Sequence, residues 1–225
     1  MSDWTAALAT AVLILLYEST LLVGIFAKRG RNATRLHATL REDWFNALAR
    51  EKGTEILAVQ AIRNALMSTT VIASTSALAL MATATLTLPS LHGSFSGAAA
   101  EAAQSNPSLL LGLMLLLLLF TSLVLTTMAV RYFNHVSFIV AMPVGSAARR
   151  RWHASGTSYL RRAGILYAWG LRQLILVAPV LAGLLHPIAG PIAGLLILSI
   201  MIALDRVRDV PPLQEITESS TPNAE

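Results

Sequence analysis

The chain has 225 residues, of which 55% are hydrophobic and 13% charged, whereas soluble domains carry about 25% charged residues, so an ordinary soluble domain is excluded. The net charge of +5 fits the Lys/Arg bias of cytoplasmic loops in membrane proteins, and we therefore expect no nucleic-acid partner. The absence of cysteine excludes disulfides, thiolate metal sites and thiol nucleophiles.

The apolar residues come in runs of about 17 or more, the length that crosses hydrocarbon as a helix. The first run extends from about Thr5 to Ala27 and contains Glu18. From Lys28 to Glu55 the chain is polar and basic, and an apolar residue recurs there at every fourth position. This spacing predicts an amphipathic cytoplasmic helix, whose apolar stripe is Leu36, Leu40, Trp44 and Leu48. Such a helix either lies along the membrane surface or packs against the ends of the other helices.

The second apolar segment, Ala65 to Leu88, is rich in small and hydroxyl residues, which let helices approach closely. We expect it in the centre of the bundle, followed by a loop from Pro89 to Pro107. The third segment, Ser108 to about Val130, is expected to continue as a helix to Met142. A basic loop is expected next, containing Arg149–Arg151 and Arg161–Arg162.

The last apolar stretch, Ala163 to Leu204, is too long for one crossing and is interrupted at His186–Pro191, where two prolines and a glycine favour a break. Either both halves cross the membrane, giving five crossings, or the second half is re-entrant, giving four plus a half-helix. Five crossings, with the N-terminus outside and the C-terminus inside, leave no basic residue in an outer loop, so we choose five. The fold class is thus all-α, a polytopic helical membrane protein, with one transmembrane domain over residues 1–210 and a disordered cytoplasmic tail over 211–225.

Polar residues within or beside these segments lie at a comparable depth, in the cytoplasmic half of the membrane. Glu18 lies ~20 Å from the outer edge at ~1.5 Å per residue, and a carboxylate that deep must be protonated or paired with an arginine, for which Arg172 is the best candidate. The other members come from the inner ends of the second and third segments: Gln60, Arg63, Asn64, Arg131, Asn134 and His135. We expect these side chains to meet in one cluster. Its surplus of arginine would attract an anion.

Several motifs make the chain resemble a membrane family of unknown function, catalogued as domain of unknown function 599. The matching elements are Arg41-x-x-Trp44, Gln60-x-x-Arg63-Asn64-x-x-Met67, Arg131-x-x-Asn134-His135, Gly170-x-Arg172, and Pro179 with Pro187. They span about residues 12 to 210, and the Gln-x-x-Arg-Asn-x-x-Met element is the most specific. The resemblance implies an integral membrane protein with several crossings and brings no reaction, substrate or cofactor.

Two functions are weighed for the predicted cluster. The first is a transporter or channel for a small anionic solute, although five short helices leave little room for alternating access unless the protein is a homo-oligomer. The second is a structural or anionic-lipid-binding protein, or an accessory subunit of a larger complex. In either case Arg41 and Trp44 join the cluster residues as candidate ligand-binding residues.

Enzymatic activity stays open, but no hydrolase, metalloprotease or phosphate-loop motif is present, and we assign no catalytic residue. No two histidines have metal-ligand spacing, so no metal site is expected, and the cofactor is unknown. The expected partners are the lipid bilayer, anionic lipid headgroups and a second copy of the chain. The expected location is the cell membrane, taken as a bacterial inner membrane, with several crossings.

Overall fold

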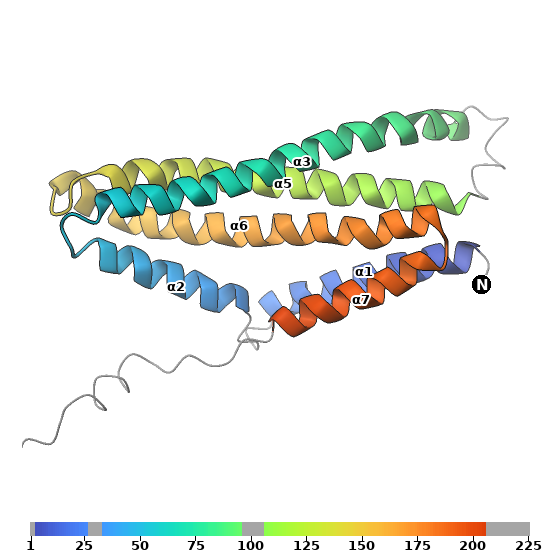
Figure 1. The fold of residues 1–225 in the computed structure, drawn as a ribbon, viewed down its shortest axis with the longest axis horizontal. Coiled ribbons are helices and arrows are strands. Elements are labelled where there is room, and N and C mark those ends of the chain that lie inside the picture. Colours follow the sequence, from blue (N-terminus) through green and yellow to red (C-terminus); the bar gives the residue numbers. More distant parts are fainter. Residues whose placement is uncertain (1–2, 27–32, 96–105, 206–225) are drawn as a thin grey trace, which may run out of the picture.

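The structure, a computed structural model, describes residues 3–26, 33–95 and 106–205. All regular elements in these ranges are α-helices. They are α1 (Asp3–Phe26), α2 (Ala33–Leu48), α3 (Glu55–Phe95), α5 (Pro107–Ala141), α6 (Ala147–Leu185) and α7 (Ala189–Asp205) (Figure 1). Four of the described helices are long and apolar enough to cross a membrane: α1, α3, α5 and α6. The expected class, a polytopic helical membrane protein, is confirmed.

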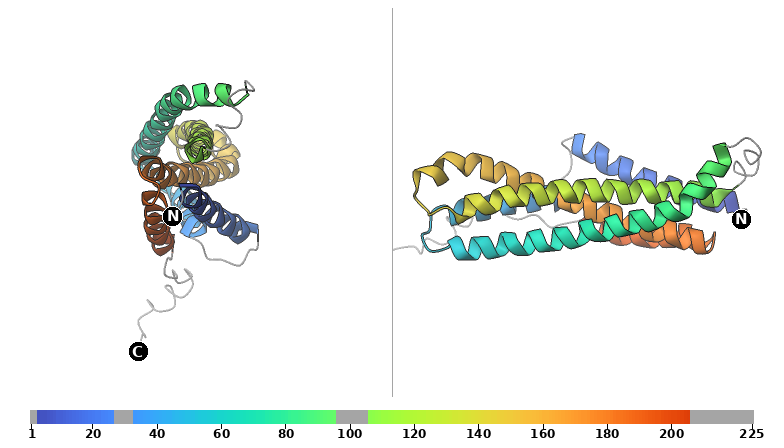
Figure 2. Two further views of the ribbon diagram at one scale, coloured as in Figure 1. Left: turned by 90° about the vertical axis from the view of Figure 1, so that its right-hand side faces the viewer. Right: turned by 90° about the horizontal axis from the view of Figure 1, so that it is seen from above.

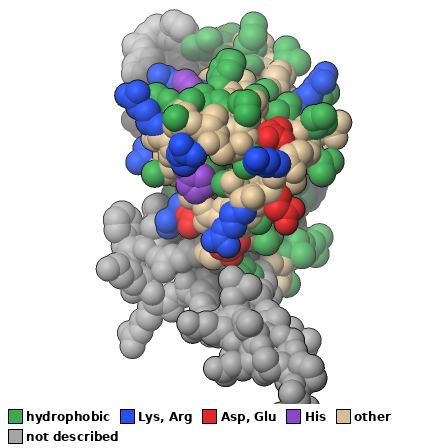
Figure 3. All heavy atoms as spheres, turned by 90° about the vertical axis from the view of Figure 1, so that its left-hand side faces the viewer, with side chains coloured by type: hydrophobic (Ala, Val, Ile, Leu, Met, Phe, Trp, Pro, Cys, Tyr) green, Lys and Arg blue, Asp and Glu red, His purple; other side chains and the backbone are tan. Residues whose placement is uncertain are grey.

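Three helices are much longer than a membrane is thick. Helices α3, α5 and α6 have 41, 35 and 39 residues, which corresponds to ~50–60 Å at ~1.5 Å per residue, against ~30 Å for the hydrocarbon core. These helices therefore extend well beyond the bilayer on at least one side. Lys and Arg side chains gather at the left-hand end of Figure 1, where α6 begins, and this end faces the viewer in Figure 3.

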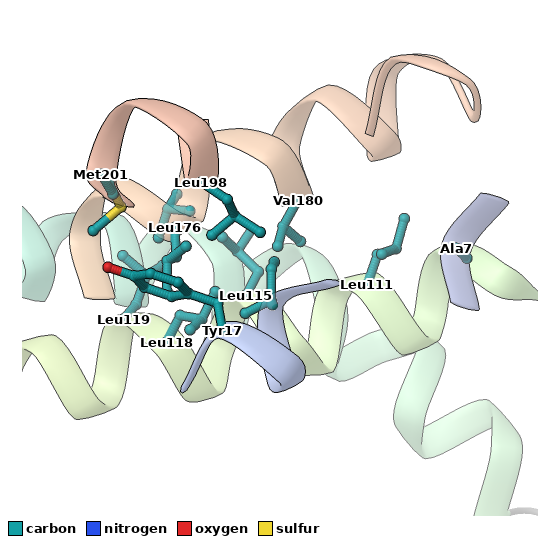
Figure 4. Packing of buried hydrophobic residues seen from close by; sticks show 12 residues of the cluster. Ala7, Tyr17, Leu111, Leu115, Leu118, Leu119, Leu176, Val180, Leu198 and Met201 are labelled. Carbon is teal, nitrogen blue, oxygen red and sulfur yellow. The ribbon is translucent and has the colours of Figure 1, made fainter. Parts of the chain in front are cut away.

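Each half of the α5–α6 pair has its own apolar core and its own neighbours. At the end opposite the basic one, α1 and α7 pack beside the pair, and buried residues such as Tyr17, Leu119, Leu176 and Leu198 pack together there (Figure 4). At the basic end α2 takes their place beside α6, and Phe45 of α2 is buried in the second core. Helix α3 covers the opposite side of α5 over its whole length (Figures 1 and 2).

A buried hydroxyl network joins α3, α5 and α6 between these two cores. The Ser122 hydroxyl donates to the Gly170 carbonyl (2.9 Å), so the Ser76 hydroxyl must donate to Ser122 (2.9 Å). Gly170 also lets α5 approach α6 closely, because a Cβ there would lie 2.5 Å from the Thr126 methyl group. In hydrocarbon, where water cannot replace a lost partner, such satisfied hydroxyls fix how the helices pack.

The second apolar segment lies at the edge of the bundle, and the expectation of a central position is wrong. Only 11% of its most apolar stretch is buried, compared with 39% for α5 and for α6. Its threonines are satisfied locally, since Thr70 and Thr75 donate to the carbonyls of Leu66 and Val71 one turn earlier. The many hydroxyl residues of this segment therefore did not indicate that it is buried, because their hydroxyl groups can donate hydrogen bonds to carbonyls of the same helix.

The amphipathic helix packs on α6 and does not lie flat along a membrane surface. Helix α2 runs beside α6 along the long axis of the bundle (Figures 1 and 2). Phe45 sits on Gly156 of α6, where an added Cβ would lie 2.7 Å from its ring, while Leu40 of the predicted stripe is 63% exposed. Of the two expectations for this helix, packing against the other helices is the one that the structure has.

Two predicted loops are helical where the structure describes them. Helix α3 continues through Pro89 to Phe95 and bends near that end (Figure 2), and the stretch from Arg149 to Arg162 belongs to α6. A proline or a run of basic residues does not always end a helix. Helices α3 and α6 continue into the predicted loops because they extend beyond the bilayer. The predicted end of α5 near Met142 and the break at His186–Pro191 are confirmed.

The number of crossings depends on α7, whose 17 residues lie at the lower limit for spanning ~30 Å of hydrocarbon. Helix α7 runs back beside α1 and α6 (Figure 1), as both expected arrangements require. The choice of five crossings stays a prediction. The predicted tail over 211–225 lies outside the described residues.

Arg149 fastens the turn between α5 and α6. Its side chain is buried, with 3% exposed, and donates to the carbonyls of Val140 (3.2 Å) and Met142 (2.7 Å) at the C-terminal end of α5. The Glu55 carboxylate at the start of α3 accepts from the backbone N–H of Val144 in the same turn (2.9 Å). A cation on the last carbonyls of a helix also interacts favourably with the helix dipole.

We expect Arg149→Ala to lower the free energy of unfolding by about 2–3 kcal/mol, because two carbonyls lose a charged donor. Thermal unfolding in detergent measures this as a lower midpoint. Arg151→Ala removes an exposed charge from the same helical turn and should change stability by less than about 0.5 kcal/mol. Equal shifts in both variants would contradict the role of Arg149.

Because the chain has no cysteine, single cysteines report topology without background. Arg151→Cys and Leu185→Cys place exposed thiols near the two ends of α6. A membrane-impermeant maleimide should label the second in right-side-out vesicles and the first only after the vesicles are inverted. Labelling of both from one side would be incompatible with a crossing by α6.

Candidate functional site

Two polar pairs lie at one level between α1, α6 and α7. Gln173 of α6 donates to the Glu18 carboxylate of α1 (2.6 Å), and Arg172 of α6 pairs with Asp205 at the end of α7 (2.5 Å). The expected pairing of Glu18 with Arg172 is therefore wrong. Asp205 takes the arginine because α7 returns beside α6 and ends opposite it.

The remaining members of the predicted cluster point away from it. Gln60, Arg63 and Asn64 are exposed on α3, and Arg131, Asn134 and His135 are exposed on α5. The His135 ring lies 5.7 Å from the ring of Tyr159, centroid to centroid, so its described neighbour is an aromatic side chain. The structure thus does not form one cluster. Ligand binding by these exposed residues stays a prediction.

Arg41 and Trp44 of α2 line a hollow of about 280 Å³ between α2, α3, α5 and α6. Its walls are mostly apolar, and Arg41 is the one charged side chain among the described residues that line it. The polar groups opposite are the hydroxyls of Ser68 and Tyr167, which hydrogen-bond to each other at 3.1 Å. An apolar hollow with one charge and a few hydroxyls fits a ligand with an anionic group and an apolar part.

A second hollow, of about 300 Å³, lies between α2, α6 and α7 and shares Arg41 and Tyr167 with the first. It is lined in addition by His37 and by the paired Arg172 and Asp205. Arg41 therefore stands between two hollows. Gly164, which lines the second hollow beside Arg41, lies ~32 Å from the Leu185 end of α6 at ~1.5 Å per residue. This distance is close to the thickness of the hydrocarbon core.

The Arg41 guanidinium lies directly on the backbone of α6. Gly164 makes this possible, since a Cβ there would lie 2.8 Å from the Arg41 Nε. Within residues 3–26, 33–95 and 106–205, no hydrogen bond or ion pair engages this guanidinium. Burial lowers the pKa of Arg41 from its usual range, although an arginine stays charged at neutral pH. A partly buried cation without a counter-ion favours an anion beside it.

The described part of the chain contains no group of three or more His, Asp or Glu side chains that could hold a metal ion. The structure therefore supplies no donor set from which a metal or cofactor could be assigned.

Sequence reasoning named Arg41, Trp44 and Glu18 but missed four residues that contact them or share a hollow with them: Gly164, Tyr167 and Asp205 near Arg41, and Gln173 at Glu18. An amide in a long apolar segment was a visible signal for Gln173, which lies next to Arg172. No pattern in the sequence marks the glycine that receives Arg41, because the contact depends on how α2 folds back onto α6.

Residues 5–210 match a family model described as protein of unknown function, DUF599. The chain belongs to this family, and the resemblance seen in its motifs is confirmed. No curated protein and no solved structure matches the chain.

The Arg172–Asp205 pair predicts a charge-dependent stability pattern. Arg172→Gln and Asp205→Asn should each cost about 1–3 kcal/mol, because each leaves a partly buried charge without its partner. The double variant should recover much of this loss, and thermal unfolding of the four proteins gives the coupling. Additive losses would show that the two side chains are not paired.

Proposed function

We propose that this DUF599 protein binds an anionic amphiphile, such as a phospholipid with a net negative headgroup, at the inner boundary of the membrane. The single observation that carries the proposal is the unpaired Arg41 guanidinium, seated on Gly164 between two hollows. The phosphate of such a lipid would pair with Arg41. Its glycerol oxygens would lie near the Ser68–Tyr167 hydroxyl pair, and apolar chain atoms would follow Trp44, Ile62 and Phe133.

The depth and charge of the site support a lipid over a soluble anion. Arg41 lies about one hydrocarbon thickness from the Leu185 end of α6. With that end at the outer edge of the hydrocarbon, Arg41 is level with the phosphates of the inner leaflet. The basic side chains of α2 and α6 at this end add a favourable potential for anionic headgroups, worth about 1 kcal/mol per residue near the surface. The walls beside Arg41 are apolar, which suits acyl chains better than a hydrated ion.

Anion transport stays a prediction with less support. The sequence suggested three arginines against one carboxylate in one cluster, but Arg172 is neutralised by Asp205, while Arg63 and Arg131 lie exposed on different helices. A homo-oligomer also stays a prediction, and the largely exposed face of α3 is the natural place for a second copy. We further place the protein in the cell membrane of a bacterium, with the basic end of the bundle facing the cytoplasm.

The test is lipid binding by the purified full-length protein in neutral detergent. A short-chain phosphatidylglycerol should bind to the parent, and Arg41→Gln should weaken binding about 10–100-fold, the loss expected for about 1.5–3 kcal/mol of charged hydrogen bonding. The matched control is Arg162→Gln, which removes an exposed arginine two residues before Gly164 and should change affinity little.

Two further ligands identify what is recognised. Short-chain phosphatidylcholine, with no net charge, should bind weakly to all three proteins. Inorganic phosphate should compete with phosphatidylglycerol only if the site recognises the phosphate group without the rest of the lipid. Equal affinity of the parent and Arg41→Gln for phosphatidylglycerol would contradict the proposal.

A further inference from the structure

The contact between α1 and α6 contains a carboxyl group whose charge no side chain in the described part of the chain balances. Glu18 accepts one hydrogen bond, from the Gln173 amide at 2.6 Å, and Gln173 is buried with 5% of its surface exposed. An amide carries no charge. Within the part of the chain that the structure describes, no ion pair engages Glu18.

The ionisable groups around Glu18 come from three helices and are otherwise occupied. Arg172 of α6 and Asp205 of α7 neutralise each other. On the far side of that pair, α2 contributes His37 and Arg41 to the hollow that Arg172 and Asp205 line. Helix α5 packs here through apolar side chains, of which Leu111, Leu115, Leu118 and Leu119 are buried.

Tyr17 is a second polar side chain at this level whose hydrogen-bonding capacity the described residues do not satisfy. Its side chain is 5% exposed and packed among Leu119, Leu176 and Met201 (Figure 4), and its buried hydroxyl has no hydrogen-bond partner among the described residues. It also lies within electrostatic range of Glu18, Arg172 and Asp205. The Tyr17 hydroxyl, which has no described hydrogen-bond partner, thus lies near the Glu18 carboxyl group, which accepts a single hydrogen bond.

Depth decides the charge state of Glu18. It lies 15 residues into α1, ~22 Å from the Asp3 end at ~1.5 Å per residue, and so within the ~30 Å of hydrocarbon. An ionised carboxylate in that medium costs several kcal/mol unless a cation compensates it, whereas a neutral carboxylic acid can share hydrogen bonds with the Gln173 amide. The proton is the cation that this site can accept.

We propose that Glu18 and Gln173 form a proton-binding site in the membrane, in which Glu18 is a neutral carboxylic acid at neutral pH. The site is independent of lipid binding at Arg41. A protonated carboxyl group in apolar surroundings is also a modification site for a hydrophobic carbodiimide. The Glu18 proton passes to one nitrogen of the reagent and the carboxyl oxygen adds to its central carbon. The adduct then rearranges to a stable N-acylurea, with no leaving group.

Dicyclohexylcarbodiimide and peptide mass spectrometry on the full-length protein in membranes provide the test. Glu18 should gain the mass of one reagent molecule at neutral pH, labelling should fall as the pH rises, and Asp205, which is paired with Arg172, should stay unmodified. Glu18→Gln should lose the adduct. An unmodified Glu18 or equal labelling of Asp205 would overturn the proposal.

Two substitutions of Gln173 separate proton binding from simple packing. Gln173→Met removes the amide but adds no charge, so labelling should persist. Gln173→Lys supplies a cation that favours the ionised form of a neighbouring carboxyl group and should reduce labelling about tenfold at neutral pH. Undiminished labelling of the lysine variant in folded protein would contradict the proposal.

Infrared spectroscopy gives a readout that does not depend on reagent access. The difference spectrum between the parent and Glu18→Gln at neutral pH should contain the carbonyl stretch of a protonated carboxylic acid. Carboxylate bands in its place would overturn the assignment even if the reagent failed to reach Glu18.

Discussion

The arrangement of the bundle depends on how closely other helices can approach α6. At Gly156 and Gly164 the helix presents bare backbone, and Phe45 and Arg41 of α2 lie directly on it. Near the other end Gly183 faces Gly190, so that α7 can turn back against α6. Because helices in a membrane gain little from burying apolar surface, close van der Waals contact and satisfied hydrogen bonds decide which helices pack together. Helix α6 can therefore hold α2, α5 and α7 at once, and both candidate sites lie against it.

The charges follow the same principle, since each charge near the hydrocarbon needs a partner. Arg149 is held by two carbonyl groups at the end of α5, and Arg172 is held by Asp205. Among the residues that the structure describes near this level, the guanidinium of Arg41 and the carboxyl group of Glu18 have no opposite charge beside them. The two groups require partners of opposite charge. An anion suits the first, at the headgroup level, and a proton suits the second, deeper in the hydrocarbon.

The two proposed sites stand on either side of one ion pair. Arg172 and Asp205 line the hollow that Arg41 shares, and Tyr17, next to Glu18 in sequence, lies in the electrostatic range of the same pair. A change of charge at either site would thus alter the field at this pair, which joins the end of α7 to α6. Lipid binding and proton binding can occur separately, but the geometry gives them a common neighbour.

The sequence by itself determined the class of protein, the apolar segments, the break at His186–Pro191 and the family, because hydropathy and helix-breaking residues act locally along the chain. It also singled out Glu18 and Arg172 as side chains that need partners, and Arg41 and Trp44 as candidate ligand-binding residues. Only the tertiary structure decided which partners they have. Depth along a helix can be counted from the sequence, but the direction of a side chain around the bundle cannot, so residues at one level were expected to meet although many lie exposed on separate helices. Pairing with Gln173 and Asp205, and the seat of Arg41 on Gly164, depend on contacts between residues 33 to 155 positions apart. Helix packing creates such contacts, and no local pattern in the sequence encodes them.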